Sequence, residues 1–370
     1  SQNLTPLSAA GGSPVASYPA SFAQQRLWIL EHLHPGRAAY NEARVMRLVG
    51  ELEIAALRSA LGELAARHES LRTRFAAVDG APVQEVLPHV EIPLAVDDLC
   101  TQLTDRREAL ASEAACAAAE RPFDMQVAPL LRVHLFRLAA TEHLLLVVMH
   151  HAITDGWSTG IFWKELAVLY AARVSGTDAN LPELPIQYAD YAVWQRQWLS
   201  GERLAGEVGY WREALAGMPV LELPADRVRP VVASFRGERV EFELPVALVG
   251  QLKGLARRER ATLFMVLLAG FEVLLWRYSG QEDFGVGVRI AGRTRPELEG
   301  LIGFFVNTLV MRARLEGQPS FKEHLARVRQ AALGAYEHQE LPFDKLVEEL
   351  NPPRDLSRNP LFEVSFAMQN

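Results

Sequence analysis

The chain has 370 residues, of which 49% are hydrophobic and 22% are charged, and its formal net charge is −7. This length exceeds what one hydrophobic core usually serves, so the sequence predicts a soluble protein with two domains. Lysine and arginine are dispersed along the chain, and no basic stripe is present that would neutralise phosphates, which argues against nucleic-acid binding.

Cysteine content and apolar runs limit the cellular setting. Cys100 and Cys116 are too few for a disulfide framework or a metal knuckle, and they fit a reduced, cytoplasmic protein. The run from Leu263 to Phe271 is about half of a membrane span, so no membrane segment is expected. Residues 1–20 are rich in small residues and proline and are predicted to be a linker. A start without Met in such a linker suggests a piece of a longer chain.

The apolar pattern between residues 45 and 174 alternates predicted strands with predicted helices. A period of 3.6 residues places Ile54, Leu57, Leu61 and Leu64 on one helical stripe, whereas short apolar runs between turn residues are typical of strands. The predicted strands are 45–48, 130–138 and 144–151, and the further predicted helices are 107–120 and 161–174.

Turn-forming residues between 175 and 187 break this pattern and predict a boundary between two lobes, 21–180 and 181–370. The second lobe has predicted helices at 191–215, 246–259, 262–277 and from Ser320, which forms a capping-box pattern with Glu323. Its predicted strands are 240–244, 284–288, 306–314 and 361–368. Both halves mix helices and strands in a similar rhythm, so we expect an α+β fold made of two lobes of two-layer α/β sandwich type.

Two adjacent histidines, His150 and His151, end the apolar run 144–149, and an Asp155-Gly156 turn follows them. Such a run is typical of a strand covered on both faces, which holds its last residue rigidly. Alternation points the two rings to opposite faces, so one ring can be structural while the other faces a cavity. Because imidazole accepts protons near neutral pH, the pattern predicts a base here; the alternative is a structural pair with both rings satisfied.

Other catalytic chemistries find less support in the residues. His150, His151 and Asp155 are possible metal ligands, but adjacent strand residues diverge and no second cluster completes a set, so no metal is expected. No G-x-S-x-G turn is present, which argues against a covalent acyl-enzyme. Gly285 and Gly287 lack the rest of a phosphate-binding fingerprint. Direct attack of one bound substrate on another, assisted by His151, fits the residues better.

Residues 149–158, MHHAITDGWS, resemble the H-H-x-x-x-D-G signature of condensation domains from nonribosomal peptide synthetases. Six further segments resemble the other motifs of that family in the same order along the chain. They are residues 21–28, 67–75, 188–194, 302–308, 338–343 and 354–361. Seven ordered motifs are hard to obtain by chance, and the first two look like those of domains that take L-configured donors.

This resemblance implies a V-shaped pseudo-dimer of two chloramphenicol-acetyltransferase-like lobes, with a tunnel entered by phosphopantetheine arms. An upstream peptidyl carrier protein would present an acyl or peptidyl thioester, and a downstream one an aminoacyl thioester whose amine attacks it. An adjoining adenylation domain, no intrinsically bound cofactor and a monomeric excised domain are further implications. An epimerisation domain and an inactive carrier-docking or recruitment module of the same superfamily are the alternatives.

The resemblance also assigns residue roles at matching positions. His151 is similar to the family's catalytic second histidine, which acts as a base or positions the amine. Gly156 would leave room for the thioester and offer its N–H to the developing oxyanion. Asp155 and Arg293 resemble the family's salt-bridging pair, and His150 would support the site.

Four further residues are predicted to line the tunnel or touch the phosphopantetheine arm, namely Trp157, Ser158, Asn307 and Arg289. Packing is the alternative for Trp157, and a capped strand end is the alternative for Asn307. Arg289 stands where family members usually carry a small or turn-forming residue, so it would narrow the tunnel. Related domains continue beyond the position of residue 370, so the second lobe is expected to be truncated.

Overall fold

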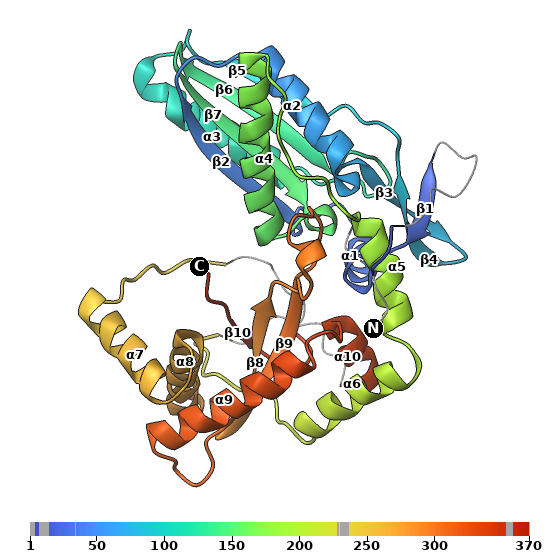
Figure 1. The fold of residues 1–370 in the computed structure, drawn as a ribbon. Coiled ribbons are helices and arrows are strands. Elements are labelled where there is room, and N and C mark those ends of the chain that lie inside the picture. Colours follow the sequence, from blue (N-terminus) through green and yellow to red (C-terminus); the bar gives the residue numbers. More distant parts are fainter. Residues whose placement is uncertain are drawn as a thin grey trace. The chain divides into compact units, whose positions relative to one another are not determined.

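The computed structural model describes residues 4–6, 15–33, 35–227, 229, 237–352 and 358–369. The chain divides into two compact units. Unit 1 is Ser1–Trp198 with Arg293–Phe305, and unit 2 is Leu199–Gly292 with Val306–Asn370. Each unit combines helices with β-sheet, as Figure 1 shows, which confirms the predicted α+β class.

The main sheet of unit 1 has a central strand that is buried on both faces. Leu145, Val147 and Met149 face one side of this strand, and Leu146 and Val148 face the other, because successive side chains alternate. The central strand is antiparallel to both of its neighbours, and the last strand pairs in parallel. In spatial order the strands are β2 (Asn41–Val49), β7 (Glu142–His150), β6 (Leu131–Ala139) and β5 (Leu94–Asp98).

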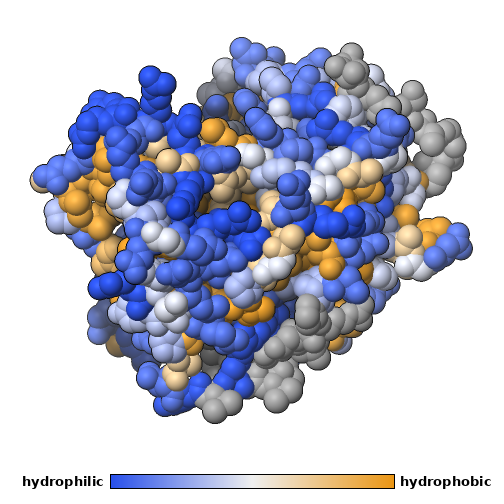
Figure 2. All heavy atoms as spheres, turned by 90° about the horizontal axis from the view of Figure 1, so that it is seen from below, coloured by the Kyte–Doolittle hydropathy of each residue, from blue (hydrophilic) through white to orange (hydrophobic). Residues whose placement is uncertain are grey.

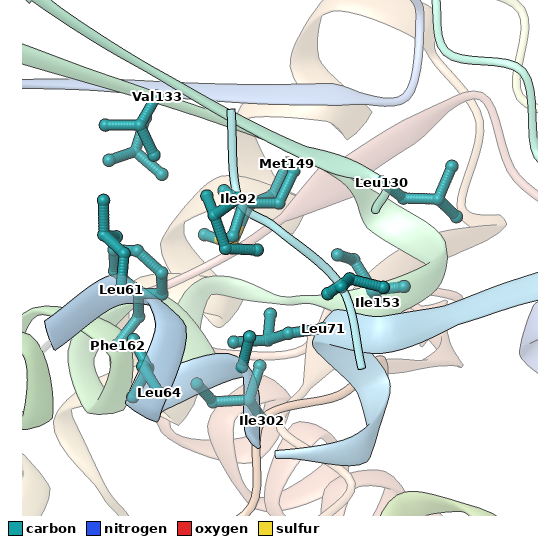
Figure 3. Packing of buried hydrophobic residues seen from close by; sticks show 14 of the residues in the cluster. Leu61, Leu64, Leu71, Ile92, Leu130, Val133, Met149, Ile153, Phe162 and Ile302 are labelled. Carbon is teal, nitrogen blue, oxygen red and sulfur yellow. The ribbon is translucent and has the colours of Figure 1, made fainter. Parts of the chain in front are cut away.

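Helices cover both faces of this sheet. α2 (Ile54–Arg67) and α4 (Gly156–Ser175) pack on one face, and α3 (Thr104–Glu120) packs on the other (Figure 1). Figure 3 shows the packed layer beneath α2 and α4, in which Ile302 lies beside Leu64 and Leu71. Ile302 belongs to the segment that returns from unit 2, so the core of unit 1 needs residues from beyond position 290.

A second sheet in unit 1 corrects the linker prediction for residues 16–19. Strand β1 forms a regular antiparallel ladder with β4, from Ala16 opposite Val86 to Pro19 opposite Val83. Composition could not reveal this strand, because its partner lies more than sixty residues away. The strands are β1 (Ala16–Pro19), β4 (Ala81–Val86) and β3 (Thr73–Val78), and α1 (Phe22–Leu33) follows β1. Residues 1–3 and 7–14 of the predicted linker lie outside the described residues.

Unit 1 extends to Trp198 rather than to the predicted boundary at residue 180. Helix α5 (Tyr188–Trp198) packs its aromatic side chains against Leu298, Leu301 and Phe305 of the returning segment. The predicted helix 191–215 is therefore two helices, α5 and α6 (Gly201–Ala214). Gly201 separates them with a φ of 55°, a left-handed conformation that a continuous right-handed helix does not contain.

Unit 2 contains a three-stranded sheet covered by helices. β8 is antiparallel to β9 and parallel to β10. A Cβ built on Gly287 would lie 2.5 Å from the ring of Phe362, so this glycine serves packing rather than phosphate binding. In spatial order the strands are β10 (Val364–Phe366), β8 (Asp283–Ile290) and β9 (Asn307–Arg314). The helices other than α6 are α7 (Val246–Arg258), α8 (Leu263–Ser279), α9 (Phe321–Glu337) and α10 (Phe343–Leu350).

The predicted strand at 240–244 does not form. Val240 and Phe242 are 83% and 81% exposed, and within the described ranges no strand pairs with this segment. Alternation gives a strand only where a neighbouring strand takes up the backbone hydrogen bonds. The predicted strand 361–368 is likewise shortened to Val364–Phe366. Of the motif at 354–361, residues 354–357 lie outside the described residues.

Over the part of the chain that the structure covers, no single helix is long and apolar enough to cross a membrane. α7 and α8 reach that threshold only together, and they are bent by 106° relative to each other. On the face drawn in Figure 2, apolar side chains form separate patches among hydrophilic ones.

Candidate active site

The two adjacent histidines have different surroundings at the end of β7. His150 is the last residue of the strand and its side chain is 1% exposed. His151 opens the 3₁₀ helix η2 (His151–Ile153), and its side chain is 36% exposed. The backbone N–H of His151 still donates to the carbonyl of Tyr40 at 2.8 Å, so β2 fixes its position although the strand has ended.

The ring of His150 is held on both nitrogens. Its Nδ1 accepts a hydrogen bond from the backbone N–H of Ala152 at 3.1 Å, so the proton of the neutral ring lies on Nε2. That Nε2 lies 3.5 Å from the Glu31 carboxylate of α1. The rings of Tyr40 and Phe123 meet the imidazole edge-on. These contacts make His150 part of the scaffold behind the site.

The ring of His151 has one nitrogen fixed and one nitrogen free. Nδ1 lies 3.1 Å from the carbonyl oxygen of Thr154, which can only accept, so Nδ1 carries the proton. Nε2 therefore has a lone pair, and no group in the described part of the chain hydrogen-bonds to it. The ring of Phe304 lies 5.4 Å away, centroid to centroid, and restricts the tilt of the imidazole. The arrangement can accept a proton or a hydrogen bond from a bound molecule.

Asp155 ties three segments together from a fully buried position. Its Oδ1 accepts from the backbone N–H of Ser158 at 2.8 Å and thereby caps α4. Its Oδ2 accepts from the backbone N–H of Phe305 at 3.0 Å. Arg293 lies 3.4 Å from Oδ1. The structure thus brings together Asp155 and Arg293, and both are buried behind the loop that carries His151.

Arg293 uses its guanidinium to join the returning segment to α4. It donates to the Ser158 hydroxyl at 2.7 Å and to the backbone carbonyl of Leu298. Its guanidinium carbon lies 4.1 Å from the centroid of the Phe305 ring. Burial lowers the pKa of Arg293, and the neighbouring Asp155 carboxylate acts in the opposite direction.

Ser158 is not placed as a tunnel-lining residue. Its side chain is fully buried, donating to the carbonyl of Gly303 at 2.8 Å and accepting from the N–H of Gly303 at 3.1 Å. The prediction of a substrate contact is therefore wrong for this hydroxyl, because its hydrogen-bonding capacity is used within unit 1. Trp157 differs: it is half exposed, and its indole N–H donates to the carbonyl of Glu299 at 3.0 Å.

Gly156 is exposed at the first position of α4. The amide N–H groups in the first turn of a helix have no intrahelical acceptor and point toward the N-terminal end, where the dipole favours negative charge. A Cβ built on Gly156 would meet no atom within 4 Å, so this chain's own packing does not require glycine there. By contrast, a Cβ on Gly303 would clash with the ring of Tyr188. The space at Gly156 is open to a bound molecule.

Asn307 and Arg289 belong to unit 2, so their predicted contacts with a tunnel stay predictions. The side-chain amide of Asn307 donates to the carbonyls of Gln339 and Leu341 at 3.0 and 2.8 Å. Its oxygen accepts from the N–H of Phe343 at 2.9 Å, which fastens the start of α10 to β9. Arg289 is exposed on β8, opposite Thr308. No grouping of three or more His, Cys, Asp or Glu among the described residues could hold a metal ion.

Sequence reasoning missed Glu42, which lies behind His151. Its side chain is 8% exposed, and its Oε2 is 3.9 Å from Nδ1 of His151. The available signal was weak: an acidic residue three positions before the predicted strand, a residue type that is usually exposed. The predicted strand begins at Val45, so Glu42 falls outside it.

Comparison with known proteins assigns the family. Residues 16–370 match the family model of the Condensation domain. The chain belongs to the condensation-domain family. It is 51% identical, over all of its 370 residues, to one component of the linear gramicidin synthase of Brevibacillus parabrevis. It is 47% identical, over 95% of its length, to phosphinothricin tripeptide synthetase PhsC of Streptomyces viridochromogenes. The chain spans only 7% and 32% of these two nonribosomal peptide synthetase proteins.

Solved structures agree on the fold. The condensation-domain chain superposes on the X-domain in its complex with OxyB from teicoplanin biosynthesis with a TM-score of 0.87 and 30% identity. That match covers 98% of this chain and 79% of the other. The first condensation domain of the calcium-dependent antibiotic synthetase, with a substrate analogue, gives a TM-score of 0.76 over 95% of this chain and 79% of the other. At 21% identity this second match supports the fold alone. Together they confirm lobes of the chloramphenicol-acetyltransferase-like type.

Proposed function

We propose that this condensation domain forms an amide bond between two carrier-bound substrates. An acyl or peptidyl thioester on an upstream peptidyl carrier protein is the donor, and the amine of an aminoacyl thioester on a downstream carrier is the acceptor. The observation that carries the proposal is the free Nε2 of His151, beside a ring nitrogen whose proton is fixed by Thr154. Sequence identities of 51% and 47% to two peptide synthetases support the same class of reaction.

The chemistry requires one proton acceptor that later becomes a donor. The acceptor amine attacks the carbonyl carbon of the thioester, forming an N–C bond, and the nitrogen gives a proton to Nε2 of His151. The tetrahedral intermediate then expels the thiolate as the C–S bond breaks, and the imidazolium of His151 returns the proton to the sulfur. General acid–base catalysis of this kind contributes about 10²–10⁴-fold to a rate.

The negative charge that develops on the carbonyl oxygen needs a donor. The N–H of Gly156, at the positive end of α4, is the group that we assign to this oxygen. One preorganised donor of this type is worth about 3 kcal/mol in the transition state. Because Gly156 has no side chain and its surroundings are open, the thioester can approach this backbone closely.

The remaining assignments follow from the same reaction. Asp155 with Arg293 holds the loop between His151 and α4, and His150 packs behind it. Trp157, Asn307 and Arg289 are proposed to contact the substrates or the carriers' phosphopantetheine arms. An adjoining adenylation domain, an L-configured donor and a cytoplasmic setting complete the proposal. The reaction needs no cofactor bound to the condensation domain itself, because the amine, the thioester and one proton acceptor account for every bond that forms or breaks.

Intact-mass analysis with two loaded carriers tests this function. The expected result is a dipeptidyl thioester on the downstream carrier and loss of the acyl group from the upstream one. Inverted stereochemistry without chain extension would instead support epimerisation. Carrier binding without turnover would favour recruitment, in keeping with the X-domain that was solved in complex with OxyB.

A further inference from the structure

A buried carboxylate lies behind the candidate base. Glu42 is on β2 opposite Met149, and Asn41 is opposite His150. The hydrogen bond from His151 N–H to Tyr40 extends this ladder by one residue, so Glu42 is the diagonal neighbour of His151 on the same side of the sheet. The register of β2 against β7 therefore places Glu42 beside the imidazole.

The two oxygens of Glu42 have different surroundings. Oε1 accepts from Arg44 at 2.7 Å, and the Arg44 side chain is 55% exposed. Oε2 is buried, has no hydrogen-bond partner in the described part of the chain, and lies 3.9 Å from Nδ1 of His151. A buried carboxylate oxygen without a donor is unfavourable, so its retention calls for a compensating interaction in another state of the site.

We propose that Glu42 is a positioning residue that acts through His151, an inference that rests on the proposed condensation reaction. The negative charge near Nδ1 favours the tautomer with the proton on Nδ1 and the lone pair on Nε2, which is the form that can receive the amine proton. When Nε2 takes that proton, the ring becomes an imidazolium whose charge is spread over both nitrogens. The Glu42 carboxylate, which is itself buried, then stabilises this cation from a distance of 3.9 Å to Nδ1.

Other acidic groups near His151 are already engaged. Glu31 of α1 lies against His150. The Asp155 oxygens are taken by the N–H groups of Ser158 and Phe305 and by Arg293. Among these three carboxylates, Glu42 is the one with a buried free oxygen aimed at the His151 ring.

The test compares Glu42→Gln with a matched control, Arg44→Gln. Gln at position 42 keeps the shape of the side chain and an acceptor for Arg44 but removes the charge. Gln at position 44 removes the ion pair on Oε1 and leaves the carboxylate in place. We expect Glu42→Gln to lower kcat about 10-fold with KM within about 2-fold, since an interaction made only on the way to the transition state affects kcat. Glu42→Asp should restore part of the loss, and Arg44→Gln should keep kcat near the wild-type value.

A spectroscopic readout separates this inference from the proposed function. In ¹⁵N spectra of histidine-labelled protein, assigned with His151→Ala, wild type and Arg44→Gln should show the Nδ1–H tautomer of His151. Glu42→Gln should lower the population of that tautomer without abolishing it, because the Thr154 carbonyl still accepts from Nδ1. Equal tautomer populations in wild type and Glu42→Gln would overturn the role of Glu42, even if the chain forms no amide. An equal loss of kcat in Arg44→Gln and Glu42→Gln would also overturn it, because Glu42 would then act through its ion pair. Absence of product from wild type, with the tautomer shift intact, would refute only the condensation reaction.

Discussion

Two buried acid–base pairs, one in each unit, are built differently. In unit 1, the oxygens of Asp155 accept from two backbone N–H groups and lie beside Arg293. In unit 2, Glu272 of α8 and His324 of α9 are both 1% exposed. Their Oε2 and Nε2 atoms lie 3.0 Å apart but are not aligned for a hydrogen bond, and Nδ1 of His324 has no partner among the described residues.

The difference shows what each pair does for its unit. Asp155 fixes the start of α4 and the returning segment, so its charge serves the geometry around His151. Glu272 and His324 join two helices inside a core, and burial raises the pKa of Glu272 because few donors replace its water. A well-satisfied buried charge holds backbone in place, whereas a poorly satisfied pair adds little beyond its own packing.

The largest effect on activity is expected from His151→Ala. This variant tests the role of the imidazole in the reaction while leaving the contacts of Asp155 in place. If His151 is the base that we propose, its loss should lower product formation about 10²–10⁴-fold. The ring is partly exposed and makes one hydrogen bond, so the melting temperature should stay close to wild type. Single-turnover assays with loaded carriers and a thermal melt measure the two quantities. Near-normal turnover would show that the reaction does not need His151.

Asp155→Ala should damage stability and activity together. The change uncaps α4, frees the Phe305 N–H and leaves Arg293 buried without its partner. Removing one member of a buried pair costs about 3–5 kcal/mol of unfolding free energy. Chemical denaturation measures this loss, and Asp155→Asn serves as the control that keeps the shape but not the charge. An unchanged unfolding curve would show that Asp155 does not brace the loop.

His324→Leu should lower the unfolding free energy by a smaller amount, about 2 kcal/mol, because Glu272 can become protonated instead of staying charged. The double variant with Glu272→Leu should recover most of that loss or exceed wild type, since apolar packing replaces an unsatisfied pair. A double-mutant cycle of unfolding free energies gives the coupling between the two residues. If the double variant lost the sum of the two single losses, the coupling would be zero and Glu272 and His324 would stabilise unit 2 independently of each other.

The smallest effect concerns the pH dependence of unit 2. Because the pKa of Glu272 is raised in the folded protein, folding favours its protonated form. The stability that this provides is full below the unfolded value of about 4.5 and is lost as pH rises through the folded pKa. Unfolding free energies of Glu272→Gln should therefore improve relative to wild type as pH increases from 4 to 7. A constant difference over that range would show that the pKa of Glu272 is the same in the folded and the unfolded protein.

Elements with strong local periodicity were predictable to within a few residues. The stripe of Ile54, Leu57, Leu61 and Leu64 gave α2, and the apolar run before His150 gave β7. The failures depend on distant partners. Strand β1 exists because β4 pairs with it, and residues 240–244 alternate without such a partner.

At the site, motif resemblance and strand-end geometry pointed to His151, Asp155, Gly156 and Arg293 as candidates, and the structure places Arg293 3.4 Å from Asp155. It could not assign Ser158, because the hydroxyl bonds to Gly303, which lies 145 residues away along the chain. Glu42 was hidden for a related reason. Its proximity to His151 follows from the register of two strands about one hundred residues apart, and local patterns do not encode register.

The segment Arg293–Phe305 leaves a hairpin of unit 2 between β8 and β9 and packs in unit 1. The polypeptide thus passes from one unit to the other three times, and Ile302 and Arg293 cannot be supplied by residues before Trp198. Engineers who exchange parts of such domains between synthetases should therefore not treat position 198 as a clean crossover. A chimera joined there would inherit a loop evolved for a foreign core, and successful grafts should carry residues 293–305 together with the N-terminal half.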